Sequence, residues 1–138
     1  MKLDFELKTN LAPEKIWPLY SNIENWYKWE EDLQHISLGG PFITGSSGEM
    51  ILEGQPPIKY ELVEVTDNRS FCDKTAIPGI GDLYFNHELI PLDSYTIIRH
   101  SVEFISSSGE DAEEQLTFLQ QVFADVPHSI FALRDAYK

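Results

Sequence analysis

The stretch from Leu116 to Tyr137, LTFLQQVFADVPHSIFALRDAY, decides the fold that the sequence predicts. Its apolar residues recur every three or four positions, the pattern of an amphipathic helix with one buried face. They are Leu116, Leu119, Val122, Phe123, Val126, Ile130, Leu133 and Tyr137. Pro127 cannot continue a regular helix, so we expect a kink after Asp125 or a restart at Val126. A long helix of this kind needs a large apolar surface to pack against.

Strand-like segments supply that surface. One opens the chain at residues 2–8, and six more are expected at residues 33–38, 48–53, 58–65, 70–76, 82–90 and 95–104. They show alternating or apolar patterns bounded by turn residues, and short connections between consecutive strands imply antiparallel pairing. Tyr60 shares a parity with Ile58 and Leu62, whereas Val63 and Val65 take the other, so a β-bulge is expected there.

Two short helices are expected between the first two strands. Pro13 suits the first helical position, and Pro18 should bend or shorten the helix that follows. A second helix is expected at residues 23–27. The tryptophans of this region are interpreted mainly as core residues that cover the sheet and hold the short helices on it; they are Trp17, Trp26 and Trp29. At the last helix, the acids Glu110, Asp111, Glu113 and Glu114 favour the positive end of its dipole.

These elements predict one α+β domain spanning residues 1–138. A seven-stranded antiparallel sheet is expected to curve around the long C-terminal helix, with the two short helices after strand 1. Only one element is a long amphipathic helix, so it is expected to cover the buried face of the sheet.

Charge and cysteine content exclude several classes of protein. The formal net charge of −13 leaves no basic stripe for nucleic acid and would be repelled by an anionic membrane surface. No apolar run is long enough to span a bilayer, and no secretory leader is visible. Cys72 is the single cysteine, which fits a reducing cytoplasm. We therefore expect a cytoplasmic monomer or homodimer without membrane insertion.

Several motifs resemble the START-related (SRPBCC) superfamily of polyketide cyclases, dehydratases and lipid-transfer domains. They are Ala12-Pro13-Glu14-Lys15-Ile16-Trp17, Asn25-Trp26-Tyr27-Lys28-Trp29, Gly45-Ser46-Ser47-Gly48, Glu64-Val65-Thr66-Asp67-Asn68-Arg69-Ser70-Phe71, Phe85-Asn86-His87-Glu88-Leu89, Ile98-Arg99-His100-Ser101-Val102 and Val126-Pro127. The resemblance covers nearly the whole chain and implies a helix-grip fold with an internal cavity. Members bind lipids, sterols, polyketides or hormones, and some catalyse cyclisation or dehydration. They share no catalytic set, so no catalytic residue is transferred to this chain.

His87 and His100 are the candidate catalytic residues. Each shares a strand face with apolar residues, so both imidazoles are expected to point inward from neighbouring strands. Two histidines in an apolar cavity can act as general acid and base or bind a polar group of a ligand. Two buried histidines satisfied by their neighbours remain the favoured alternative.

The inward strand faces and the last helix predict a site for an apolar small molecule, such as a lipid or polyketide. Its predicted lining residues are Tyr60, Phe85, His87, Ile98, His100, Val102, Leu119, Phe123 and Ile130. No metal or cofactor is predicted, because the histidines lack a third ligand on a nearby element. Two other functions stay open: a cyclase or dehydratase that uses the two histidines, and a protein-interaction module.

Overall fold

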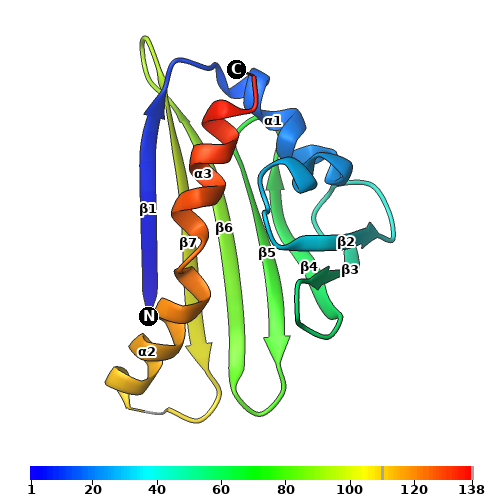
Figure 1. The fold of residues 1–138 in the computed structure, drawn as a ribbon, viewed down its shortest axis with the longest axis vertical. Helices are drawn as coiled ribbons and strands as arrows, with labels where there is room; N and C mark the ends of the chain where they lie inside the picture. Colours follow the sequence, from blue (N-terminus) through cyan, green and yellow to red (C-terminus); the bar gives the residue numbers. More distant parts are fainter. Residues whose placement is uncertain (110, 138) are drawn as a thin grey trace.

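The computed structural model describes residues 1–109 and 111–137. Seven strands form one antiparallel sheet in the order β1-β7-β6-β5-β4-β3-β2 (Figure 1). The strands are β1 (Lys2–Thr9), β2 (Leu33–Leu38), β3 (Ser47–Leu52), β4 (Ile58–Thr66), β5 (Ser70–Ile77), β6 (Gly81–Pro91) and β7 (Thr96–Ser106). All seven strands lie within a few residues of their predicted ranges, because the alternation and the turn residues are local signals.

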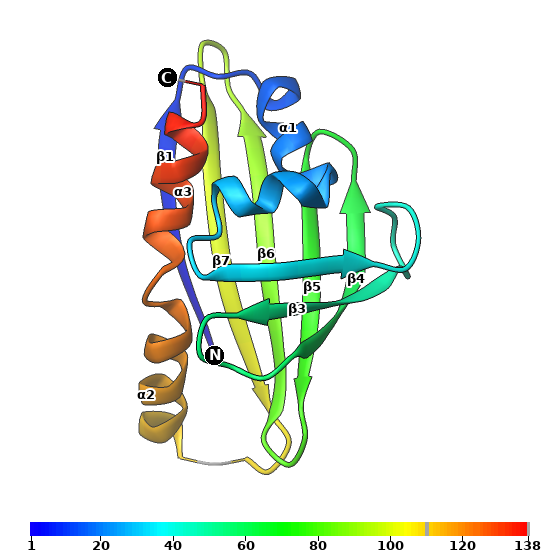
Figure 2. The same ribbon diagram turned by 45° about the vertical axis from the view of Figure 1, so that its right-hand side comes forward.

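The sheet curves strongly at its β2–β3 end. In Figure 2, β2 and β3 cross in front of β4, β5 and β6, so that the inner face is enclosed between them. A register shift between Leu62 and Glu64 confirms the predicted bulge in β4. Gly48 lies where β3 approaches β2, and a Cβ there would overlap the backbone carbonyl of Ser37. This position therefore requires glycine.

Two helical segments follow β1 and lie over the same inner face. Helix α1 (Pro13–Ser21) starts with Pro13 at its N-terminus and runs through Pro18 for only nine residues, as the prediction of a short helix requires. The short second helix predicted at residues 23–27 is confirmed as the 3₁₀ helix η1 (Ile23–Lys28). The three tryptophans are buried, as expected, with Trp26 and Trp29 each 2% exposed. They fix both helical segments to the sheet.

The C-terminal helix is interrupted, as Pro127 predicts. Helix α2 (Ala112–Phe123) ends two residues before α3 (Val126–Asp135), which confirms the restart at Val126. Both segments run along the β1–β7 side of the sheet (Figures 1 and 2). Asp111 caps α2 by accepting a hydrogen bond from the backbone N–H of Glu113; the predicted contribution of Glu110 lies outside the described residues.

The break in the helix coincides with a division of the hydrophobic core. One cluster joins α1, η1 and α3 to the inner face of the sheet and includes Tyr20, Trp26 and Phe71. A second cluster lies under α2 and includes Leu83 and Phe104. Because the two clusters are separate, the interior is not filled uniformly.

Within the described ranges, no helix is long and apolar enough to cross a membrane.

Candidate functional site: a small interior cavity beside a buried histidine pair

His87 on β6 and His100 on β7 face each other across the sheet. They are register partners, and their ring centroids lie 4.6 Å apart. Their side chains share the inner face with apolar neighbours, as the alternation predicts, and the residues are only 6% and 3% exposed. The two rings nevertheless have different surroundings.

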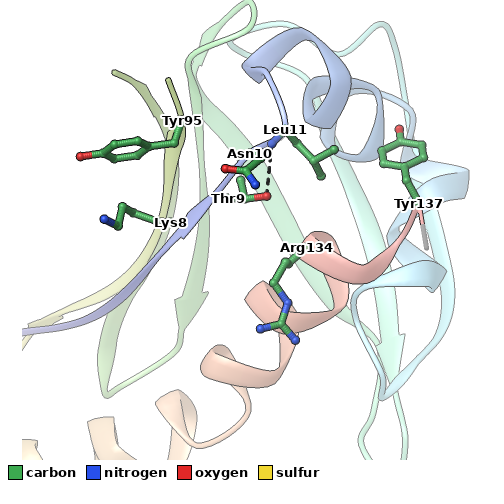
Figure 3. Close-up of a pocket in the computed structure, with 7 residues that line it drawn as sticks. All are labelled: Lys8, Thr9, Asn10, Leu11, Tyr95, Arg134 and Tyr137. Atoms are coloured by element: carbon green, nitrogen blue, oxygen red, sulfur yellow. Dashed lines mark hydrogen bonds between the residues drawn. The ribbon is translucent and has the colours of Figure 1, made fainter. Parts of the chain in front are cut away.

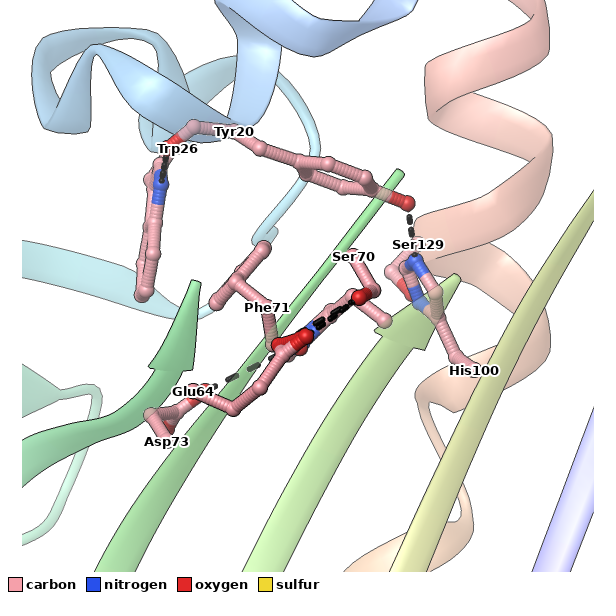
Figure 4. Close-up of polar contacts among 9 residues, drawn as sticks. Tyr20, Trp26, Glu64, Ser70, Phe71, Asp73, His100 and Ser129 are labelled. Atoms are coloured by element: carbon pink, nitrogen blue, oxygen red, sulfur yellow. Dashed lines mark hydrogen bonds and ion pairs between the residues drawn. The ribbon is translucent and has the colours of Figure 1, made fainter. Parts of the chain in front are cut away.

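His100 belongs to a chain of hydrogen bonds that joins three elements (Figure 4). Its Nε2 lies 2.7 Å from the Tyr20 hydroxyl, and its Nδ1 lies 3.1 Å from Ser129 Oγ. The Ser129 hydroxyl donates its hydrogen to the Val126 carbonyl at 2.7 Å, so it must accept from His100. Nδ1 therefore carries the hydrogen, and Nε2 accepts from Tyr20. Both ring nitrogens are used in linking α1, β7 and α3.

His87 is held by its ring face and by one nitrogen. The ring stacks on Phe71 with centroids 4.0 Å apart and planes 6° from parallel. Nδ1 lies 3.3 Å from the Phe71 carbonyl, which can only accept, so this nitrogen is the protonated one. Nε2 is then left as a hydrogen-bond acceptor.

Burial keeps both imidazoles neutral. It lowers the pKa of His87 to about 3, opposed only in part by backbone carbonyls. It also lowers the pKa of His100 well below the usual value, and the neighbouring His87 adds to this effect. Burial likewise raises the pKa of Tyr20 and keeps its hydroxyl protonated.

Both rings are therefore expected to remain neutral at pH 5 with hydrogen on Nδ1. Long-range ¹H–¹⁵N spectra recorded from pH 8 to pH 5 would report the tautomer and charge of each ring directly. A titration midpoint above pH 5 for either ring would contradict this assignment.

A small cavity of about 80 Å³ lies beside His87. Its wall comes from η1 and the residues that follow it, from β2, β3 and β4, and from β5 and β6. Six lining residues are apolar: Trp26, Leu33, Met50, Leu52, Ile58 and Phe85. Four are polar: Glu30, Asp73, Thr75 and His87. The site is an apolar pocket with a polar wall on one side.

Asp73 is the most unusual part of that wall. It is 4% exposed, and its one ion-pair contact among the described residues is with His87, whose Nδ1 lies 3.9 Å away and which is cationic only when protonated. Burial raises the pKa of the Asp73 carboxyl well above its usual range, and repulsion from Glu30 adds to the rise. Burial, with repulsion from Asp32 and Asp125, also raises the pKa of Glu30 to about 7. The cavity therefore holds two carboxyl groups that resist ionisation.

Of the predicted lining residues, Phe85 and His87 border this cavity. Tyr60 instead donates its hydroxyl to the Ser37 carbonyl at 2.8 Å and is 2% exposed. Ile98, Val102, Leu119 and Ile130 are completely buried in the core, and Phe123 packs against the lower cluster. The cavity thus lies against the β2–β3 hairpin, further from the C-terminal helix than the sequence suggested.

The acids of the cavity were not predicted from the sequence. Asp73 has the same strand parity as Phe71 and Thr75, and it pairs across the sheet with Phe85. This alternation could therefore have predicted that the Asp73 carboxyl points inward. Glu30 follows η1 without any periodic pattern, so only the tertiary structure brings it to the cavity.

A larger hollow of about 460 Å³ lies on the outer surface near the start of α1 (Figure 3). It is open to solvent, and its lining includes Lys8, Tyr95 and Arg134. An apolar ligand bound in this hollow would remain exposed to water. Within residues 1–109 and 111–137, no group of three His, Cys, Asp or Glu side chains is placed to hold a metal ion.

Solved structures with the same arrangement of elements are distant in sequence. The structure of Ara h 8.0201 superposes with a TM-score of 0.75 at 12% identity, covering 97% of this chain and 95% of its own. Norcoclaurine synthase from Thalictrum flavum gives 0.75 at 12% identity, with coverages of 99% and 92%. The Aha1 protein of Colwellia psychrerythraea gives 0.66 at 15% identity, with coverages of 99% and 95%.

This chain has the helix-grip fold. The fold that the START-related resemblance implied is therefore confirmed. No protein-family model and no curated protein sequence matches the chain. At these identities the likeness shows the helix-grip fold alone, so the function has to be argued from the cavity.

Proposed function

We propose that this helix-grip protein binds a small apolar molecule in the interior cavity. The observation that carries the proposal is a cavity of about 80 Å³ bordered by six apolar side chains and by the polar side chains of Glu30, Asp73, Thr75 and His87. A protein interior is normally close-packed, and a void costs stability unless it is occupied. A norcoclaurine synthase of the same fold has been solved with dopamine and hydroxybenzaldehyde, which supports a small-molecule site on this scaffold.

The size of the cavity limits the ligand. A volume of about 80 Å³ is well below the 300–1,000 Å³ of sites for drug-sized ligands. It suits a group of about four to six non-hydrogen atoms, or the end of a longer molecule. Leu52, Ile58 and Phe85 are only partly buried, so they form the side at which the cavity can open.

The geometry does not favour His87 and His100 as an acid–base pair. Catalysis would require both rings to reach one substrate. His87 borders the cavity, whereas both nitrogens of His100 are engaged by Tyr20 and Ser129. We assign His100 a structural role and His87 a ligand-contacting role.

A protein-interaction module would require a contiguous exposed apolar patch. The large exposed hydrophobic residues lie instead on separate elements and loops; they are Met1, Tyr27, Ile43, Ile80, Leu92, Ile105, Leu116 and Tyr137. This scattering favours the cavity over the surface as the functional site.

Phe85→Trp is expected to abolish binding of a neutral probe such as 1-butanol, because the larger ring fills the cavity. Binding would be followed by amide chemical-shift changes at the lining residues, with at least a tenfold loss of affinity expected. Ile105→Trp is the matched control, because Ile105 is 51% exposed and an added indole there leaves the cavity unchanged. Equal affinities for the two variants, or cavity shifts absent from the unaltered protein, would contradict the proposal.

A further inference from the structure

We propose that the outer hollow near the start of α1 binds a small aromatic anion, such as an aryl phosphate. The hollow is a second site, because none of its described lining residues borders the interior cavity. Lys8 and Arg134 supply its cations, and Tyr95 and Tyr137 supply aromatic surface (Figure 3). The inference is therefore independent of the ligand proposed for the cavity.

Three parts of the chain meet around the hollow. Residues 8–11 lead from the end of β1 into the turn before α1, Tyr95 precedes β7, and Arg134 and Tyr137 come from α3 and the residues after it. The volume of about 460 Å³ falls within the range of roughly 300–1,000 Å³ that is usual for small-molecule sites. A ligand with one aromatic ring and one charged group therefore matches the hollow in size.

The charge of the lining is opposite to that of the whole chain. Acidic residues outnumber basic residues by 23 to 10 in the sequence, yet the described lining contains Lys8 and Arg134 and no carboxylate. Lys15 adds a third cation beside it, because its Nζ lies 4.6 Å from the centre of the Tyr137 ring. The net charge of −13 repels an anion at long range, but salt at about 0.15 M screens charges beyond about 8 Å. The nearby cations therefore dominate at the hollow.

The two lysines are held by aromatic rings. Lys8 Nζ lies 4.6 Å from the centre of the Tyr95 ring, at the same distance as Lys15 Nζ from the Tyr137 ring. None of the ion pairs within residues 1–109 and 111–137 involves Lys8 or Lys15. A ring face attracts an ammonium group without supplying it with a carboxylate. Both ammonium groups can therefore donate to an anion while the tyrosines restrict their positions.

Neutral and charged donors add to the two lysines. Arg134 donates from Nε and Nη2 to the two carboxylate oxygens of Asp135 at 2.7 and 3.0 Å, so the charge of Asp135 is balanced within this pair. The Arg134 Nη1 lies on the side of the guanidinium that Asp135 does not engage. The Thr9 hydroxyl accepts from the Leu11 N–H at 3.3 Å, so its own hydrogen can be donated. A phosphate dianion has acceptors only, and charge-assisted hydrogen bonds of this kind are strong.

The aromatic part of the ligand has its own surface in the hollow. Tyr137 donates its hydroxyl to the Lys15 carbonyl at 2.8 Å, which fixes this ring. Leu11 adds an aliphatic side chain to the lining. A ligand ring that packs against these side chains removes apolar surface from water and can contact a tyrosine edge-to-face. We therefore expect the ring and the anion to contribute together to affinity.

The test compares phenyl phosphate, inorganic phosphate and benzyl alcohol at pH 7.5 in about 0.15 M potassium chloride. Amide chemical-shift changes at residues 8–11 would give each affinity. Phenyl phosphate is expected to bind at least fivefold more tightly than either of the other two. Lys8→Gln combined with Lys15→Gln should weaken the binding of phenyl phosphate at least tenfold.

The matched control is Lys28→Gln combined with Lys59→Gln. This variant makes the same change in net charge at exposed residues of η1 and β4, outside the hollow, and should keep the affinity within about twofold. Equal weakening by the two double variants would overturn the inference, because the net charge alone would then explain it. The inference would also fail if inorganic phosphate or benzyl alcohol bound as tightly as phenyl phosphate, or if phenyl phosphate shifted no amide at residues 8–11. Binding of 1-butanol tests the interior cavity separately, so failure of one site leaves the other standing.

Discussion

Asp73→Asn is expected to stabilise the folded protein, and the gain is expected to increase as the pH rises. Unfolding releases the Asp73 carboxyl into water, where it ionises readily. In the folded state its pKa lies well above the usual 3.8, because burial and Glu30 disfavour the charge. Between these two pKa values the folded protein binds the extra proton, so its stability falls as pH increases. Asparagine retains the shape of the side chain and removes this loss.

The expected gain is absent below pH 3.8 and rises by up to about 1.4 kcal/mol per pH unit above it. It levels off once the pH passes the pKa of the folded state. Urea unfolding of both proteins at pH 5, 6, 7 and 8 would measure the slope. Asp93→Asn is the control, because Asp93 is exposed and should show no such slope. A pH-independent difference, or destabilisation by Asp73→Asn at pH 8, would contradict the explanation.

The same sign argument applies to the histidines, with the opposite result. Their pKa values are lowered in the folded state, to about 3 for His87, so the unfolded chain binds more protons below pH 6.5. Their contribution to stability is present above that pH and is lost on acidification. The acids and the histidines therefore oppose each other between about pH 4 and pH 6.5. For this reason the Asp73→Asn comparison is more informative than the pH profile of the unaltered protein.

Tyr20→Phe is expected to destabilise the fold by about 1–3 kcal/mol, the usual cost of leaving a buried polar atom without a partner. The change removes the hydroxyl that donates to His100 Nε2 at 2.7 Å. Tyr20 is completely buried and also packs edge-on against Phe71 and Trp29, so water cannot easily replace the hydroxyl. The phenyl ring itself is retained, so the loss reports on the hydrogen bond.

Tyr137→Phe provides the control for this substitution. Its hydroxyl donates to the Lys15 carbonyl at 2.8 Å, but the residue is 46% exposed and water can take its place. A loss below about 0.5 kcal/mol is therefore expected in urea unfolding. Equal losses for the two variants would mean that the Tyr20–His100–Ser129 chain contributes no more than a surface hydrogen bond.

His100 contributes to the stability of the fold, whereas His87 and Asp73 border the cavity proposed as the functional site. The His100 chain is fully satisfied and connects α1, β7 and α3. The cavity wall carries two carboxyl groups whose ionisation burial disfavours. Groups that cost stability without a structural return are common at functional sites, because natural proteins accept such a cost where a ligand is bound. This supports the cavity as the site.

Local sequence signals were sufficient for the secondary structure. The alternation of the strands, Pro13 at the start of α1 and Pro127 at the break between α2 and α3 act on the backbone within a few residues. The single long amphipathic stretch, interrupted once, also fixed which element covers the sheet. The inward direction of His87 and His100 followed from strand parity alone. These features are determined by the sequence itself.

The tertiary structure alone decided where the interior stays open and what charge surrounds it. Packing of Phe71 on His87 and closure of β2 and β3 over β5 and β6 left a cavity away from the C-terminal helix. Glu30 and Asp73 are 43 positions apart in the chain, and only the curvature of the sheet brings their carboxyls together. The physical reason is that side-chain volume and desolvation depend on all neighbours at once, whereas backbone preferences depend on a few residues in sequence.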